Sequence, residues 1–248
     1  MMGFMEKLKP YQKLSAGCLK IIAIITMLID HFAAGVYAEL YNKGYLLEWG
    51  MMDNATEIYR LCRNIGRFAF PVFCFLLVEG FFYTKSRIKY LRNLVIFALV
   101  SEVPFDLLLM GGIGFNGQNV FFTLAIALCT IWGITQVKDK FLKNATVSGM
   151  LQVLVILAGC VSAYLLDTDY SYYGVLLVVI FYYYRHNRLL ACALGYVWFL
   201  FEPWSLPAFI ALLFYNGKRG ISLKYFFYAF YPAHLLLLYG LRILLIGK

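Results

Sequence analysis

Apolar residues along the chain form long runs that are separated by short polar connections. A run of about 18 to 20 apolar residues is long enough for a helix to cross the hydrocarbon core of a bilayer. We therefore predict an all-α fold, a polytopic helical membrane bundle with about nine spans (about eight to ten). The expected spans are residues 16–38, 64–83, 93–110, 119–136, 146–166, 171–184, 189–203, 205–216 and 223–246.

Two of these runs and one connection are unusual in length. Residues 171–184 and 205–216 are shorter than the roughly 17 residues of a perpendicular span, so they are re-entrant, buried in protein or merged with a neighbour. Residues 39–63 form the longest connection and are a candidate for a short interfacial helix. No connection approaches the roughly 50 residues that a separate domain needs, so residues 1–248 are expected to form one integral membrane domain.

The composition supports this interpretation. The chain is 62% hydrophobic and only 14% charged, and its mean hydropathy is +0.74, which excludes a soluble domain. The net charge of +9 would suit nucleic acid, but the lysines and arginines cluster between apolar runs, as membrane topology distributes them. We therefore expect a lipid bilayer and no nucleic acid as partner. The six cysteines occur singly, so neither a disulfide nor a metal site is predicted.

Positive charge alternates between successive connections. Residues 111–119 and 167–173 contain no Lys or Arg, whereas the intervening connections are basic and are therefore assigned to the cytoplasm. This pattern predicts a plasma-membrane protein with a cytoplasmic N-terminus and, for an odd number of spans, an extracytoplasmic C-terminus. The charges in this pattern are Lys7, Lys9, Lys13, Lys20, Lys85, Arg87, Lys89, Arg92, Lys138, Lys140, Lys143, Arg185, Arg188, Lys218, Arg219 and Lys224, with Arg242 and Lys248 opposing it at the C-terminus.

Asp30 and His31 stand side by side near the end of the first apolar run. A charge at the bilayer centre costs about 2.5–3.5 kcal/mol on insertion scales, so ionisable groups within spans are rare and point to function. Adjacent helix positions differ by about 100° in direction, so each side chain is expected to meet a different neighbour. The structural alternatives are that Asp30 partners Arg67 or a hydroxyl and that His31 is a satisfied interior histidine.

Further polar residues interrupt other runs. Glu102 lies midway through the third run and His234 near the middle of the last one. Arg67, at the outer end of the second run, is either an interface anchor or a site residue. Glu79, near the cytoplasmic end of that run, either snorkels or faces the entrance for a cytosolic substrate. Asn119 begins the fourth run, where it caps, packs or binds. These residues converge on one chamber only if their helices are neighbours.

Five segments, in order, resemble the TraX family: LKIIAIITMLIDHF, IGRFAFPVFCFLLVEGFFYT, SEVPFDLL, NVFFTLAIAL and FYPAHLLLLY. The family takes its name from a conjugative-plasmid protein that acetylates the N-terminus of pilin, and it is similar to the wider transmembrane acyltransferases. The resemblance covers nearly the whole chain. It implies an acetyl-CoA-dependent acyltransferase in which His31 is the catalytic histidine.

The chemistry implied by this resemblance suits the polar residues. Attack of an amine or hydroxyl on a thioester needs a general base, and neutral imidazole is suited to that role. His31 is the expected base. Asp30 or Glu102 would orient its ring, and Arg67 or Asn119 would donate to the oxyanion. His234 is either a second proton carrier or the acyl acceptor of a ping-pong route.

The negatively charged nucleotide of coenzyme A would bind on the cytoplasmic side, where six basic residues offer positive partners: Lys85, Arg87, Lys89, Arg92, Arg185 and Arg188. Arg87, Arg92, Glu79 and Asn119 form the candidate cofactor set. The alternative is that these arginines set topology and contact anionic lipid. The acceptor is an amine or hydroxyl on a peptide N-terminus, a sugar or a small molecule. Two other functions stay open from sequence: a proton-coupled transporter and a non-catalytic membrane-assembly protein.

Overall fold

The computed structural model describes residues 8–115, 117–221 and 224–246, all of whose regular elements are helical. The chain divides into two compact units. The first comprises residues 74–99 and 115–201, and the second comprises residues 2–73, 100–114 and 202–248. The side chains of Lys7, Lys224 and Lys248, which enter the charge pattern, lie outside the described residues.

Within the described residues, six helices are long and apolar enough to cross a membrane, and three shorter apolar helices occupy the remaining expected spans. This confirms the predicted all-α polytopic membrane bundle. The six long helices are Ala16–Asn42, Ala55–Tyr83, Arg87–Met110, Val120–Lys140, Ala145–Leu165 and Tyr225–Ile246. The three shorter ones are Ser171–Tyr183, Arg188–Trp198 and Pro203–Leu213.

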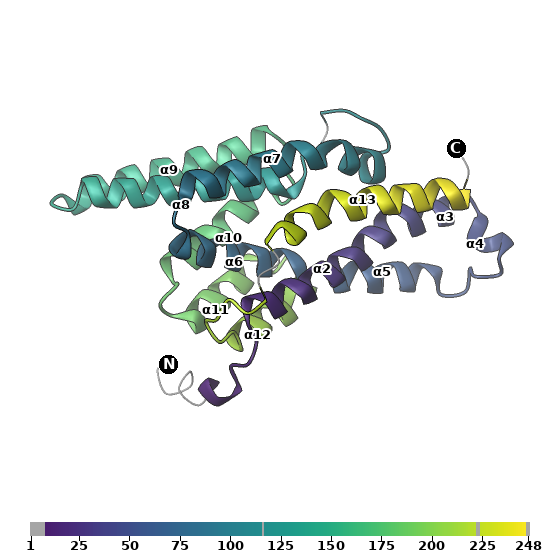
Figure 1. Cartoon of the computed structure of the whole chain (residues 1–248), viewed down its shortest axis with the longest axis horizontal. Helices are drawn as coiled ribbons and strands as arrows, with labels where there is room; N and C mark the ends of the chain where they lie inside the picture. The colour runs from purple at the N-terminus through teal and green to yellow at the C-terminus, as the bar shows by residue number, and fades with distance from the viewer. Residues whose placement is uncertain (1–7, 116, 222–223, 247–248) are drawn as a thin grey trace. The chain divides into compact units, whose positions relative to one another are not determined.

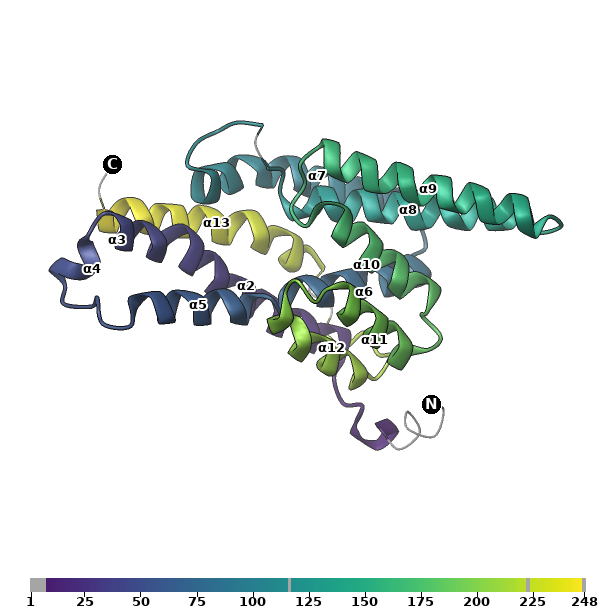
Figure 2. The same cartoon turned by 180° about the vertical axis from the view of Figure 1, so that it is seen from behind.

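The first unit is built around three packed helices, α8 (Val120–Lys140), α9 (Ala145–Leu165) and α10 (Ser171–Tyr183), seen in Figure 2. It also holds α11 (Arg188–Trp198) and most of α6 (Ala69–Tyr83) and α7 (Arg87–Phe105). Side-chain oxygens of Asn119, Asn144 and Asn187 accept backbone N–H groups at the starts of α8, α9 and α11, which satisfies donors that a helix start leaves unpaired. Asparagines in the connections therefore fix where these helices begin.

Helix α11 ends at Trp198, five residues before the expected end at 203. Pro203 limits this span, because its ring disfavours helical geometry at Glu202 and it opens the 3₁₀ turn η4 (Pro203–Ser205). The expected seventh span is therefore as short as its neighbours α10 and α12 (Leu206–Leu213).

The first long helix, Ala16–Asn42, belongs to the second unit. Helix α2 (Ala16–Phe32) passes through a π-helical segment, η2 (Ala33–Tyr37), into α3 (Ala38–Asn42), so the first span ends four residues later than the expected 38. The connection that follows carries two helices, α4 (Tyr45–Glu48) and α5 (Ala55–Gly66). The unit also includes η3 (Asp106–Met110), η4, α12 and α13 (Lys224–Ile246).

Helices α5 and α6 are separated by a turn at residues 67–68. Pro71 suits this break, because in the first turn of α6 its missing N–H costs no helical hydrogen bond, whereas in a continuous helix it would leave a carbonyl without its donor. The turn places Arg67 at the end of α5, outside the regular helix.

Helices α2 and α13 lie side by side and run in the same direction (Figure 1). Later residues of α2 contact later residues of α13, as parallel helices require. The Lys20 ammonium lies 5.3 Å from the Phe227 ring centroid, and His31 forms a hydrogen bond with His234. Further on, the Tyr45 hydroxyl donates to the Ile246 carbonyl. Parallel first and last spans require an odd number of membrane crossings.

Candidate functional site

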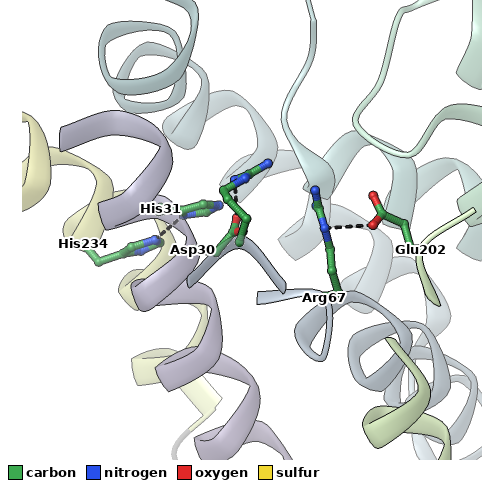
Figure 3. Close-up of polar contacts among 6 residues, drawn as sticks. Asp30, His31, Arg67, Glu202 and His234 are labelled. Carbon is green, nitrogen blue, oxygen red and sulfur yellow. Dashed lines mark hydrogen bonds and ion pairs between the residues drawn. The ribbon is translucent and has the colours of Figure 1, made fainter. Parts of the chain in front are cut away.

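Two intramembrane histidines, 203 positions apart in sequence, form a direct hydrogen bond in the second unit (Figure 3). The Nδ1 atom of His31 lies 2.7 Å from the Nε2 atom of His234. Their rings are nearly parallel, with an interplanar angle of 7°. Tyr231 presents an edge to both rings, and Phe230 stacks on His234. His234 is 5% exposed, so the pair is held in a largely apolar setting.

The hydrogen bonds assign a proton position to each ring when both are neutral. His234 Nδ1 lies 2.8 Å from the Phe230 carbonyl oxygen, which only accepts, so Nδ1 carries the hydrogen. His234 Nε2 is then an acceptor, and His31 Nδ1 must donate to it. Among the described residues, His31 Nε2 has no hydrogen-bond partner, so its lone pair is available to take a proton. This is the arrangement that a general base requires.

Asp30 contacts a different part of the unit. Its Oδ2 accepts a hydrogen bond from Arg63 Nη1 of α5 at 2.8 Å, while the neighbouring His31 faces α13. The expected structural partner Arg67 is not the residue that pairs with Asp30. Because α5 ends at Gly66, Arg67 lies in the turn beyond it and pairs with Glu202 at 2.9 Å (Figure 3).

Close packing of α2 against α5 depends on Gly66. A Cβ atom at Gly66 would overlap the Asp30 side chain, so glycine is what allows the two helices to approach at this level. Asp30 is 9% exposed, and within the described residues its Oδ1 has no hydrogen-bond partner. The single bond from Arg63 therefore anchors a buried carboxylate directly beside the histidine pair.

Glu102 lies on α7, two residues before Pro104, in the part of that helix that belongs to the second unit. It is half-buried. All five predicted catalytic residues thus fall in this unit, and the structure brings His31 and His234 together directly. The predicted catalytic residues are Asp30, His31, Arg67, Glu102 and His234.

All four predicted cofactor-binding residues lie in the first unit. Glu79 pairs with Arg185 at 2.8 Å, and the Arg87 guanidinium lies over the Phe81 ring at 4.3 Å. Asn119 caps α8 and donates to the Ala98 carbonyl at 2.8 Å, contacts that match the capping and packing alternative. Arg92 is exposed.

Three charged residues of the second unit were not identified as site candidates from sequence. Arg63 and Glu202 complete the two ion pairs. Arg242 donates to the carbonyls of Gly35, Leu107 and Leu108 and so joins α13 to the π-helical segments η2 and η3. The four-residue spacing of Arg63 and Arg67, which would place both on one side of a continuous helix, was visible in the sequence. In the structure Arg63 lies on α5 and Arg67 in the turn after it. Within the described residues, no group of three or more His, Cys, Asp or Glu side chains could hold a metal ion.

The fold and the histidine pair define a multi-pass helical membrane protein whose first, second and last long helices hold two hydrogen-bonded histidines and the Asp30–Arg63 ion pair. The chain belongs to the TraX family, since the family model described as TraX protein matches residues 15–242. It is also similar to a probable fimbrial assembly protein FimC, serogroup H1, from Dichelobacter nodosus. The two are 30% identical over 262 aligned residues, which cover 93% of this chain and 97% of that protein. No solved structure matches the chain.

Proposed function

We propose that this protein is an acyltransferase that moves an acetyl group from cytosolic acetyl-CoA to an amine or hydroxyl acceptor, with His31 as general base. The supporting observation is the chain of hydrogen bonds from His31 Nδ1 through His234 to the Phe230 carbonyl. This arrangement leaves His31 Nε2 as the basic atom. When His31 is protonated, its Nδ1–H can still donate to His234. Membership of the TraX family is consistent with this activity.

The reaction balances without an added redox or metal group. The acceptor nitrogen or oxygen attacks the thioester carbonyl, and His31 Nε2 takes the proton that the acceptor loses. The carbon–sulfur bond then breaks, and the same proton passes from His31 to the leaving thiolate. His234 acts as a second proton carrier, because its Nε2 can receive the Nδ1 proton of the charged His31 ring. The products are the acetylated acceptor and free coenzyme A.

The turn between α6 and α7 suits the phosphates of coenzyme A. Lys85, Lys89 and Arg92 are exposed there, and Ser86 accepts the Lys89 N–H at the start of α7. Cations beside the N-terminus of a helix favour phosphate binding. Arg87 packs on Phe81, so we assign phosphate binding mainly to the three exposed cations. With the predicted cytoplasmic N-terminus, this turn faces the cytosol.

The test is acetyl transfer by purified protein in nanodiscs, with radiolabelled acetyl-CoA and a panel of amine and hydroxyl acceptors. Coenzyme A release is followed by mass spectrometry, because the six free cysteines would react with thiol reagents. His31→Ala is expected to lower the rate about 10²–10⁴-fold, the usual contribution of a general base. The matched control is His186→Ala, since His186 is exposed in the turn after α10. Equal activity of His31→Ala and the parent would remove His31 from the mechanism.

A second candidate is a non-catalytic role in assembly of surface fibres, which the name of the Dichelobacter nodosus relative favours. The two functions differ in their dependence on His31. If cells that carry His31→Ala assemble surface fibres as the parent does, while purified protein turns over no acyl-CoA, the assembly role is the correct one. A proton-coupled transporter would instead move protons across the proteoliposome membrane when a gradient of its substrate is imposed, in the absence of any acyl-CoA.

A further inference from the structure

A cavity of about 420 Å³ lies where α3 and α13 end in the second unit. This volume is within the range of about 300–1,000 Å³ that small-molecule sites occupy. An acid, two cations, a phenol and two aliphatic side chains line it. They are Glu39, Lys43, Tyr239, Arg242, Ile243 and Ile246.

The charges in this cavity are not neutralised by one another. Among the described residues, none of Glu39, Lys43 and Arg242 takes part in an ion pair. Arg242 is held by neutral acceptors, the carbonyls of Leu107 at 2.5 Å and Leu108 at 2.9 Å. Its guanidinium, which also lies 5.0 Å from the Tyr239 ring centroid, is therefore fixed in position, and no carboxylate among the described residues neutralises it.

The cavity lies on the same seam between α2–α3 and α13 as the histidine pair. Gly35, between His31 and Glu39 in the first long helix, accepts a hydrogen bond from Arg242, which lies about two turns beyond His234 on α13. Both helices are long and apolar enough to cross a membrane, and the cavity lies at their ends. Ile243, which lines the cavity, is 37% exposed, and the next residue of α13, Leu244, is 84% exposed. Acyl chains of a lipid would contact such side chains.

We propose that this cavity binds a phosphoethanolamine group. The Glu39 carboxylate accepts hydrogen bonds from the primary ammonium, and Lys43 and Arg242 bind the phosphate. The Tyr239 hydroxyl adds a polar contact. The group comes either from the headgroup of a membrane phospholipid or from free phosphoethanolamine, and the same three charges recognise both. This site is independent of the acyl transfer proposed for His31.

The test measures the midpoint of thermal unfolding of the purified protein in detergent as ligand is added. The probes are short-chain phosphatidylethanolamine, phosphatidylcholine and phosphatidylglycerol, and free phosphoethanolamine. We expect phosphatidylethanolamine to bind at least about tenfold more tightly than the other two lipids, because only its ammonium carries N–H donors for Glu39. A shift by free phosphoethanolamine of similar affinity identifies the soluble source, and its absence identifies the lipid.

Variants locate the binding in this cavity. Glu39→Gln is expected to remove the preference for the primary ammonium, and Lys43→Gln to weaken phosphatidylethanolamine and phosphatidylglycerol alike by roughly tenfold. Glu48→Gln, at an exposed acid of α4 outside the cavity, is the control and should bind as the parent does. Unchanged unfolding midpoints without ligand show that the variants fold. Equal shifts by all the lipids, or a preference that survives Glu39→Gln, would overturn the proposal.

Discussion

Removing Arg63 from its ion pair with Asp30 should lower the free energy of unfolding more than removing Asp30 does. The Asp30 and Arg63 side chains are 13% and 26% exposed, respectively. Arg63→Ala leaves a buried carboxylate whose Oδ1 already lacks a partner among the described residues. Removing one partner of a buried pair costs about 3–5 kcal/mol, and we expect a loss in that range. Asp30→Ala should cost only about 1–2 kcal/mol, because the longer Arg63 side chain reaches water.

The assay is reversible unfolding of the purified protein in mixed micelles, for the two single variants and the double variant. The double variant should lose less stability than the sum of the single variants, with a coupling of about 1–3 kcal/mol. Arg60→Ala is the control, because Arg60 is exposed on the same helix, and it should change stability by no more than about 0.5 kcal/mol. Equal losses from both single variants, adding without coupling, would refute the claim that Arg63 compensates a buried charge.

Three further variants test contacts around the same centre, each by the same unfolding assay. Gly66→Ala should lose about 1–3 kcal/mol, because its Cβ overlaps Asp30, whereas Gly149→Ala, in open space on α9, should be neutral or slightly stabilising. Arg242→Gln should lose about 1.5–3 kcal/mol with its charged hydrogen bonds to backbone carbonyls. Glu202→Gln should lose no more than about 1 kcal/mol, since its pair with Arg67 is about one-fifth exposed; a loss as large as that of Arg63→Ala contradicts this ranking.

The membrane helices were predictable because hydropathy and length alone determine them. The breaks within and between them were less so. Pro203 shortens α11, and the turn before Pro71 separates α5 from α6, yet Pro104 and Pro232 lie inside α7 and α13. Proline therefore ends one helix and is tolerated inside another, depending on which groups donate a hydrogen bond to the carbonyl that proline leaves free.

The candidate site was predictable as a set of residues and not as a set of contacts. Asp30, His31 and His234 stand out because ionisable groups are expensive inside a span. Their partners depend on which helices are neighbours, and no local pattern reports that α2 and α13 lie side by side in parallel. The sequence assigned Arg63 to the end of the connection 39–63, because the polar first turns of the second long helix gave no sign that it begins at Ala55.

For the acyl transfer that we propose, the polar groups of the second unit also favour direct transfer over an acyl-enzyme on His234. Asp30 and Arg67 are each paired with an opposite charge. Together with a neutral histidine pair, these ion pairs bring no net charge into the apolar interior. Both nitrogens of His234 are engaged, one with His31 and one with the Phe230 carbonyl. Acylation of His234 would break at least one of these bonds, each worth about 0.5–1.5 kcal/mol, and would disrupt the proton arrangement of His31. Because Nε2 of His31 is already the basic atom, proton removal from the acceptor is the step that requires the least rearrangement.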